Sequence, residues 1–154
     1  YARTFSTASE SLLFMGATGL GKTLLSGCIA RAVADRGYSV CYVSAGKLFS
    51  DFETEKFRLK EDGALTGEYL QTDLLIIDDL GTEMTTQFTV SALYQIVNGR
   101  LLSGKPTIVS TNLPDTELEA RYSAQIASRL LGAYTLYQFC GTDVRLLRKM
   151  ESRG

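Results

Sequence analysis

Short apolar segments recur along the chain, separated by longer segments in which apolar residues return every three or four positions. Most of the short segments are apolar throughout, which is typical of strands covered on both faces, and the last one alternates. The predicted strands are Ser11–Met15, Val40–Val43, Leu74–Ile77, Thr107–Ser110 and Tyr134–Phe139. Buried strands that alternate with helices indicate an α/β fold, with a parallel sheet between helices on both faces.

The longer segments predict helices with one apolar face each. The first follows Lys22-Thr23 and runs to about Arg36, where Gly37 can end it in a left-handed conformation. Its inner face is expected to carry Leu25, Ile29, Ala32 and Val33. The other predicted helices are Gly46 to about Lys60, Thr85 or Thr86 to the stop at Gly104-Lys105-Pro106, Pro114–Arg121, Ser123–Leu131 and Val144–Met150.

The helix that begins at Thr85 or Thr86 contains a competing turn signal. Asn98-Gly99 is typical of a β-hairpin, but the flanking residues keep the helical period and never alternate. We therefore predict a continuous helix, in which Gly99 costs about 1 kcal/mol. The inner face of this helix is expected to carry Phe88, Leu93, Val97 and Leu101.

The loop after the first strand carries a phosphate-binding motif. Gly16–Thr23 reads GATGLGKT and matches G-x-x-x-x-G-K-[ST] at every constrained position, between a strand and a helix as the motif requires. Glycines allow a tight turn with inward N–H groups, and the following helix directs its positive end to the same point. The predicted nucleotide-binding residues are Gly16, Ala17, Thr18, Gly19, Leu20, Gly21, Lys22, Thr23 and Leu24.

Two side chains of this motif have expected roles toward a nucleoside triphosphate. Lys22 would reach the β- and γ-phosphates, and the Thr23 hydroxyl would ligate the Mg²⁺ that bridges them. The glycine order G-x-x-G-x-G differs from G-x-G-x-x-G, which argues against NAD or FAD. The alternative is a glycine-rich turn that precedes a lysine by chance, which leaves the flanking strand and helix unexplained.

Acidic residues follow the third predicted strand. Asp78-Asp79 ends the run Leu74–Ile77, and the carboxyl end of a buried strand is where P-loop ATPases hold their metal. We predict that Asp78 binds Mg²⁺, directly or through water, and that Asp79 orients or deprotonates the attacking water. An Asp-Asp turn after an ordinary strand is the alternative, and the presence of Gly16–Thr23 favours the metal site.

The fourth predicted strand also runs into polar residues, Thr111-Asn112. Sheets of this class place ligand-facing groups at that edge, so Asn112 is expected to hold the γ-phosphate or the attacking water. Capping of the turn Leu113-Pro114-Asp115 is the alternative role for Asn112.

The helix predicted from Gly46 to about Lys60, for which Ser44 can act as N-cap, is crowded with charges. We interpret these charges as a solvated face. The alternative is that Phe57, Arg58 and Lys60 contact single-stranded nucleic acid by stacking and charge.

The composition narrows the class of protein. A chain of 154 residues with 45% hydrophobic content is long enough for one domain and too short for two. The net charge of −1 provides no global attraction to nucleic acid, and the absence of histidine excludes His-based catalysis and most zinc sites. The three cysteines, expected to be buried reduced thiols, are Cys28, Cys41 and Cys140.

The sequence also bears on location. It contains no apolar run long enough to cross a bilayer and no signal peptide, so we expect a cytoplasmic ATPase domain without a membrane partner. Because the chain begins with Tyr1 rather than Met, we expect a fragment from which an N-terminal segment is missing.

The segments GATGLGKT, LLIIDDLGTE, IVSTNL, ASRL and GTDVR occur in this order. Together they resemble the AAA+ domain of bacterial replicative helicase loaders of the DnaC and DnaI type, over nearly the whole chain. The resemblance implies a P-loop NTPase core with a parallel sheet of order 5-1-4-3-2, ATP and Mg²⁺ as ligands, and weak or switch-like hydrolysis. We expect one domain over residues 1–154, with a polar, unpatterned linker (1–10) and a core (11–140). The resemblance implies that residues 141–154 form a reduced lid or C-terminal helix.

The resemblance also implies roles for individual residues. Gly16–Thr23 corresponds to the Walker A loop, Asp78-Asp79 to the Walker B pair and Asn112 to the sensor 1 position. Arg129 corresponds to an arginine finger offered to the ATP of a neighbouring subunit, and Arg145 to the sensor 2 position. Without the resemblance, either arginine is more readily a surface ion-pair former.

The implied partners are the replicative DNA helicase, through the missing N-terminal segment, single-stranded DNA, and further copies of the chain. Asp79 stands where many AAA+ enzymes carry glutamate, which predicts slow turnover. Three alternatives remain open: a transposition helper ATPase of the IstB type with the same core, a small P-loop kinase, and a nucleotide-binding adaptor that never hydrolyses ATP.

Overall fold

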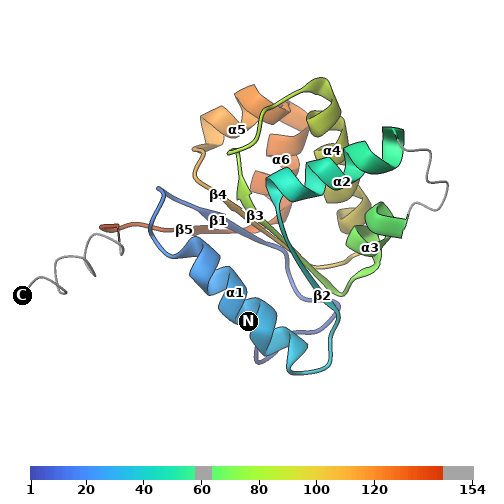
Figure 1. Cartoon of the computed structure of the whole chain (residues 1–154). Helices are drawn as coiled ribbons and strands as arrows, with labels where there is room; N and C mark the ends of the chain where they lie inside the picture. The colour runs from blue at the N-terminus through green and yellow to red at the C-terminus, as the bar shows by residue number, and fades with distance from the viewer. Residues whose placement is uncertain (58–63, 144–154) are drawn as a thin grey trace, which may run out of the picture.

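The computed structural model describes residues 1–57 and 64–143, in which five parallel strands form one sheet (Figure 1). The strands are β1 (Leu12–Met15), β2 (Val40–Ser44), β3 (Leu74–Leu80), β4 (Thr107–Thr111) and β5 (Thr135–Gln138). They lie in the order β2-β3-β4-β1-β5, and every neighbouring pair is parallel. This is the order 5-1-4-3-2 read from the other edge, so the expected sheet is confirmed.

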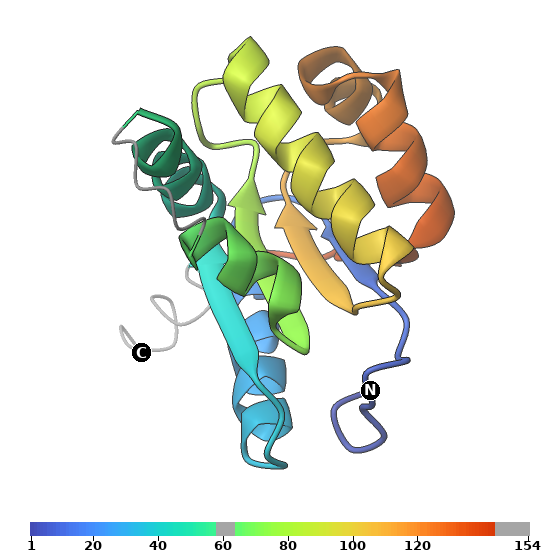
Figure 2. The same ribbon diagram turned by 90° about the vertical axis from the view of Figure 1, so that its right-hand side faces the viewer.

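Helices cover both faces of the sheet. In the described part of the chain, α1 (Lys22–Ala34) covers one face and the other helices lie on the opposite face (Figures 1 and 2). The helices of the opposite face are α2 (Ala45–Phe57), α3 (Ala64–Gln71), α4 (Gln87–Leu102), α5 (Asp115–Tyr122) and α6 (Ala124–Ala133). None of the helices in residues 1–57 and 64–143 combines the length and apolar character needed to cross a bilayer.

Two apolar cores fill the space between the sheet and its helices, because successive strand residues point to opposite faces. In β3, Ile76 packs on the side of α1, whereas Leu75 and Ile77 belong to the larger core on the other side. By the same alternation Asp78 follows Ile76 onto the α1 side. The strand pattern therefore already decides which layer the acidic residue faces.

The inner face of α1 differs from the expected one. Ile29 and Val33 are buried as predicted, but Leu25 is 43% exposed and Ala32 is exposed too. The buried stripe consists of Lys22, Ser26, Ile29 and Val33. Because the Lys22 side chain occupies the preceding loop, the residues that follow it at helical spacing are turned toward the sheet.

The helix predicted from Thr85 or Thr86 is confirmed as α4. Thr86 is its N-cap, and the helix continues through Gly99, so the hairpin alternative is not realised. Leu93 and Val97 are buried as expected, whereas Phe88 and Leu101 are only partly buried.

The structure contains one helix that the pattern does not predict, and part of the predicted helices lies outside the described residues. The pattern does not predict α3, which is short and contains Gly67, a residue of low helix propensity. Residues 58–60 of the predicted second helix and the predicted helix Val144–Met150 lie outside the described residues.

Residues 1–10, expected as a linker, pack on the α1 side of the sheet. Phe5 is 1% exposed, and its ring centroid lies 5.0 Å from that of Tyr38. The Arg36 guanidinium donates hydrogen bonds to the carbonyls of Ala2 at 2.9 Å and Phe5 at 3.0 Å. The buried Phe5 ring and the hydrogen bonds from Arg36 thus hold a segment that has no periodic pattern of its own.

The predicted burial of the cysteines is wrong. Cys28 and Cys140 are exposed, and Cys41 is half-buried; all three are free thiols. Cys28 lies on the outer side of α1, Cys41 on the edge strand β2, and Cys140 just beyond the edge strand β5. Apolar neighbours in sequence do not bury a residue on an edge strand or an outer helix face.

Candidate nucleotide-binding site

The loop between β1 and α1 has the backbone that the glycine motif predicts. Gly16, Gly19 and Gly21 have φ angles of 147°, 85° and 92°. Residues with a Cβ rarely adopt such angles, so glycine is needed at these positions. Helix α1 begins at Lys22, directly after this loop, and the positive end of its dipole favours an anion there.

The Lys22 side chain extends back from the start of α1 into this loop, and the residue is 6% exposed. Its Nζ donates hydrogen bonds to the carbonyl oxygens of Gly16 at 2.5 Å and Ala17 at 2.8 Å. Burial lowers the pKa of Lys22, and the charges of Asp79 and Asp78 oppose that shift. The ammonium group is therefore held where the motif places the phosphates.

The Asp78 carboxylate is surrounded by three hydroxyl groups and is 7% exposed. Its Oδ1 accepts hydrogen bonds from Thr23 Oγ1 at 3.3 Å and Ser110 Oγ at 2.5 Å. Its Oδ2 accepts one from the Tyr42 hydroxyl at 2.7 Å. Burial and the bond to Asp78 raise the pKa of Tyr42 above its usual value. The fold thus brings Thr23 and Asp78 together, as the sequence predicts.

Ser110 and Tyr42 are absent from the predicted site. A signal for both exists in the strand pattern, because each lies near the carboxyl end of a strand that neighbours β3. Ser44 of β2 is the register partner of Asp78, and Tyr42, two residues earlier, points to the same face of the sheet. Ser110 of β4 follows Val109, the partner of Ile77, and therefore also points to the face of Asp78. These side chains meet Asp78 only because β2 and β4 lie on either side of β3, which the sequence pattern alone does not show.

Asp79 departs from the regular strand. Its φ is 61°, and the pairing of β3 with β4 shifts register between Ile77 and Leu80. The predicted strand end at Ile77 is therefore corrected: β3 continues to Leu80 through a bulge. The Asp79 N–H donates to Ser110 Oγ at 2.9 Å, while the residue itself is exposed. A bulge redirects a side chain, here leaving Asp79 open to solvent beside the buried Asp78.

Thr23 and Asp78 fit a magnesium ion. Adjacent oxygen ligands of octahedral Mg²⁺ lie about 3 Å apart, and Thr23 Oγ1 and Asp78 Oδ1 are 3.3 Å apart. Among the described residues, no group of three or more His, Cys, Asp or Glu side chains could hold a metal. Mg²⁺ is commonly bound through one or two protein groups together with phosphates and water, which matches this pair beside a phosphate-binding loop.

Asn112 lies beside the start of the phosphate-binding loop. It is exposed and lines a cavity of about 430 Å³ together with Gly16 and Ala17. The following turn is closed by Thr111, whose Oγ1 accepts a hydrogen bond from the Leu113 N–H at 3.1 Å. Thr111 thus makes this turn contact, and the role of Asn112 stays a prediction.

Of the two predicted arginines, Arg129 can be located, and it does not belong to this cluster. Arg129 Nε donates to Asn98 Oδ1 at 2.9 Å, and its guanidinium carbon lies 4.8 Å from the centroid of the Tyr94 ring. Both partners belong to α4, so Arg129 lies between α6 and α4. Arg145 lies outside the described residues.

The chain after β5 passes over the loop, a feature that no motif indicates. The Phe139 N–H donates to the Met15 carbonyl at 2.6 Å, and a Cβ on Gly16 would lie 2.4 Å from the Phe139 carbonyl oxygen. A Cβ on Gly19 would lie 2.2 Å from the carboxyl carbon of Asp143. An acidic side chain therefore lies directly against the anion-binding loop.

Hydrogen bonds connect the loop after β3 to α5. The Gly81 N–H donates to Glu83 Oε2 at 3.0 Å, and the Tyr122 hydroxyl donates to Glu83 Oε1. Arg121 donates to Thr85 Oγ1 at 2.7 Å and to the Glu83 carbonyl at 2.8 Å. The GTE sequence that follows Asp78-Asp79-Leu80 thus connects the acidic strand end to the next helical layer.

These features agree with comparisons to known proteins. The model of the family described as IstB-like ATP binding protein matches residues 2–137. The chain belongs to this family. Two of its relatives have names that refer to different processes: one to an insertion sequence and the other to replication.

The first is a Mycobacterium tuberculosis protein named as an ATP-binding protein in an insertion sequence, 30% identical over 105 residues. The match covers 68% of the IstB-like chain and 41% of that protein. The second is the replicative helicase loader DnaC of Escherichia coli strain K12, 26% identical over 132 residues, covering 84% of the chain and 54% of DnaC. The chain thus spans about half the length of these relatives.

A crystal structure of the DnaC helicase loader has the same fold as the IstB-like chain. The TM-score is 0.81 at 21% identity, over 90% of the chain and 84% of that structure. The AAA+ P-loop fold and the expected kinship with DnaC-type loaders are confirmed, and ATP binding is supported by the family as a whole.

Proposed function

We propose that the chain is the ATP-binding and slowly hydrolysing switch domain of a helicase loader, which helps to place the replicative DNA helicase on single-stranded DNA. The observation that carries this proposal is the arrangement of Lys22, Thr23 and Asp78 around the glycine loop, with hydroxyl and carboxylate oxygens 3.3 Å apart. The 26% identity to DnaC supports the replication role.

The residues of the site divide the work on the triphosphate. Backbone N–H groups of the loop and the N-terminus of α1 bind the phosphates, and Lys22 exchanges its loop carbonyls for phosphate oxygens. Thr23 and Asp78 would hold Mg²⁺, which would neutralise phosphate charge when bound. Asn112, beside Gly16 and Ala17, holds the γ-phosphate or the attacking water.

Asp79 orients or deprotonates the attacking water in this proposal. Its exposed position next to the Asp78 cluster gives it access to water. Because its carboxylate is one methylene closer to the backbone than that of glutamate, its reach toward the water is reduced. This shorter reach supports the proposed slow hydrolysis, and stimulation by DNA or a partner is part of the same proposal.

Arg129 is proposed to act on the ATP of a neighbouring copy of the chain. Its contacts lie on α4 and α6, away from its own Lys22 and Asp78 cluster, which supports a role outside its own site. A guanidinium group suits phosphate recognition because it offers several N–H donors in one plane. Arg145 is proposed to have the sensor 2 role.

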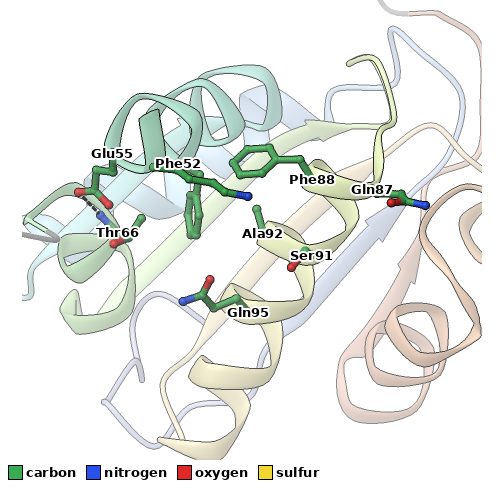
Figure 3. Close-up of a pocket in the computed structure, with 9 residues that line it drawn as sticks. Phe52, Glu55, Thr66, Gln87, Phe88, Ser91, Ala92 and Gln95 are labelled. Carbon is green, nitrogen blue, oxygen red and sulfur yellow. Dashed lines mark hydrogen bonds between the residues drawn. The ribbon is translucent and has the colours of Figure 1, made fainter. Parts of the chain in front are cut away.

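Single-stranded DNA is proposed to contact α2 and α4. Phe57 is 69% exposed, its ring lies 6.5 Å from that of Phe88, and Lys56 Nζ lies 5.0 Å from the Phe88 centroid. A cavity of about 760 Å³ between α2, α3 and α4 opens beside these rings, with Phe52 in its lining (Figure 3). Bases stack on aromatic rings while a lysine neutralises phosphate. Arg58 and Lys60, predicted for the same surface, lie outside the described residues.

The replicative helicase is proposed to bind through a segment preceding Tyr1, and the cytoplasm is the proposed location.

A second candidate function is that of a transposition helper ATPase, which the relative from an insertion sequence favours. Co-purification of the full-length protein with replicative helicase supports the loader, and co-purification with a transposase supports the helper. The family assignment does not favour the small-kinase alternative.

ATP turnover measured across protein concentrations tests the proposed site. We expect the rate per molecule to rise with concentration in the wild type and to be lost in both Lys22→Ala and Arg129→Ala. Arg31→Ala, at an exposed arginine on the outer side of α1, serves as the control and should match the wild type. Turnover that is independent of concentration and unchanged in Arg129→Ala would contradict the intersubunit role.

A further inference from the structure

Asp78, the proposed metal ligand, accepts hydrogen bonds from side chains of both neighbouring strands. Asp78 lies on β3, and the strands on either side, β2 and β4, supply Tyr42 and Ser110. All three side chains lie on the α1 side of the sheet, near its carboxyl end. The two hydroxyl groups bind opposite oxygens of one carboxylate, Tyr42 at Oδ2 and Ser110 at Oδ1.

We propose that Tyr42 is a positioning residue of the metal site, whose hydroxyl keeps Asp78 Oδ1 turned toward Thr23. The proposal rests on the proposed ATP and Mg²⁺ site and adds a residue that the phosphate-binding motif does not contain. The terminal torsion of an aspartate is broad, so one bound oxygen alone leaves the carboxylate plane free to turn. A second bond on the other oxygen fixes that plane.

The geometry of Tyr42 suits this task. Its register partner in β3 is Ile76, so its side chain reaches two residues forward along the sheet to meet Asp78 at 2.7 Å. Tyr42 belongs to the edge strand and is 40% exposed, whereas Ser110 is 1% exposed. Loss of the Tyr42 hydroxyl therefore removes one bond to Asp78 without opening a cavity in the core.

Thr23 explains why the orientation matters. Its hydroxyl and Asp78 Oδ1 form the oxygen pair that fits two adjacent ligands of one ion. Rotation of the carboxylate would separate this pair. Groups that orient the ligands of a metal change its affinity by about 10- to 100-fold when they are removed.

Fluorescent ATP binding, measured during a Mg²⁺ titration of the full-length protein and again in EDTA, tests the proposal. In Tyr42→Phe we expect the Mg²⁺ midpoint to rise about tenfold, with nucleotide affinity in EDTA unchanged. Ser110→Ala should shift the midpoint in the same direction. Tyr38→Phe is the matched control, because it removes a tyrosine hydroxyl just before the other end of β2, and its midpoint should stay at the wild-type value.

A direct measurement of the ion complements the titration. Electron paramagnetic resonance of Mn²⁺ with ADP should show weaker metal retention in Tyr42→Phe than in Tyr38→Phe. An unchanged midpoint in Tyr42→Phe, an equal shift in Tyr38→Phe, or an equal loss of affinity in EDTA would overturn the positioning role. If the wild type binds nucleotide without any dependence on Mg²⁺, this inference fails while ATP binding stands. If the wild type binds no nucleotide, the proposed function fails with it.

Discussion

Two buried ionic groups, Asp78 and Arg100, lie at opposite ends of the same strands and are satisfied in different ways. Asp78 lies near the carboxyl end of β3 and accepts bonds from side-chain hydroxyls. Arg100 of α4 is 0% exposed and reaches the amino ends of β3 and β4, where most of its partners are backbone carbonyls. Neither group forms a salt bridge within the described residues.

Arg100 connects three segments of the chain. Its nitrogen atoms donate to the carbonyls of Tyr69, Leu70, Thr72, Asp73 and Pro106 and to Thr107 Oγ1. Burial lowers the pKa of Arg100 to about 10, so the group remains charged at neutral pH. The guanidinium group thus supplies hydrogen bonds that carbonyl groups near the ends of α3, β3 and β4 would otherwise lack.

The difference between the two groups separates structure from function. Backbone carbonyls cannot leave Arg100 without a change in the fold, whereas a side-chain hydroxyl such as that of Thr23 can rotate away from Asp78 and bind a new partner. A buried charge that is satisfied by the backbone is therefore a structural feature. One that is satisfied by rotatable hydroxyls, beside an anion-binding loop, is suited to bind a ligand.

Arg100→Met tests the structural half of this comparison. We expect a loss of about 4 kcal/mol in the free energy of unfolding, because several buried carbonyls lose their donor at once. Urea unfolding followed by circular dichroism measures the loss. Arg31→Met, at an exposed arginine of α1, should change stability by less than about 0.5 kcal/mol. An Arg100→Met protein with the wild-type midpoint would contradict the structural role of Arg100.

Asp78→Asn tests the functional half. The amide still offers polar atoms to the three hydroxyls, so the unfolding midpoint should stay close to that of the wild type. ATP turnover should fall by about a hundredfold, because a neutral amide is a poor ligand for Mg²⁺. Parallel measurements of turnover and urea unfolding distinguish the two effects. A variant that loses stability but retains turnover would reverse the assignment.

Asp143→Asn should have a smaller effect of opposite sign. The carboxylate against Gly19 repels phosphate, so its removal should strengthen ATP binding about threefold at low salt. The difference should shrink as salt is added. Asp35→Asn, an exposed acidic residue at the end of α1, is the control for net charge. Weaker binding in Asp143→Asn would mean that this carboxylate supports the loop.

Local patterns in the sequence predict most of the fold and half of the site. The five strands, the glycine loop, Lys22 and the Thr23–Asp78 pair all follow from short motifs whose meaning depends on their immediate neighbours. The bulge at Asp79 and the contacts of Tyr42 and Ser110 do not, because they depend on register between strands that are far apart in the chain.

Long-range burial is the other limit of prediction. Arg100 belongs to no motif, and its role depends on carbonyls about thirty residues away as well as on that of Pro106, six residues further along the chain. The exposed cysteines show the reverse problem, because apolar neighbours along the chain say little about an edge strand. In both cases the missing information is which segments meet in space.

The two bonds from Lys22 to the carbonyls of Gly16 and Ala17 have a consequence for the nucleotide cycle. An arriving triphosphate meets an ammonium group that already has acceptors, so capture is a substitution of one oxygen for another rather than the filling of a void. When the γ-phosphate departs, the two carbonyls can accept the hydrogen bonds of Lys22 again. In the proposed cycle, this buried ammonium group would therefore have oxygen acceptors both with and without a bound triphosphate.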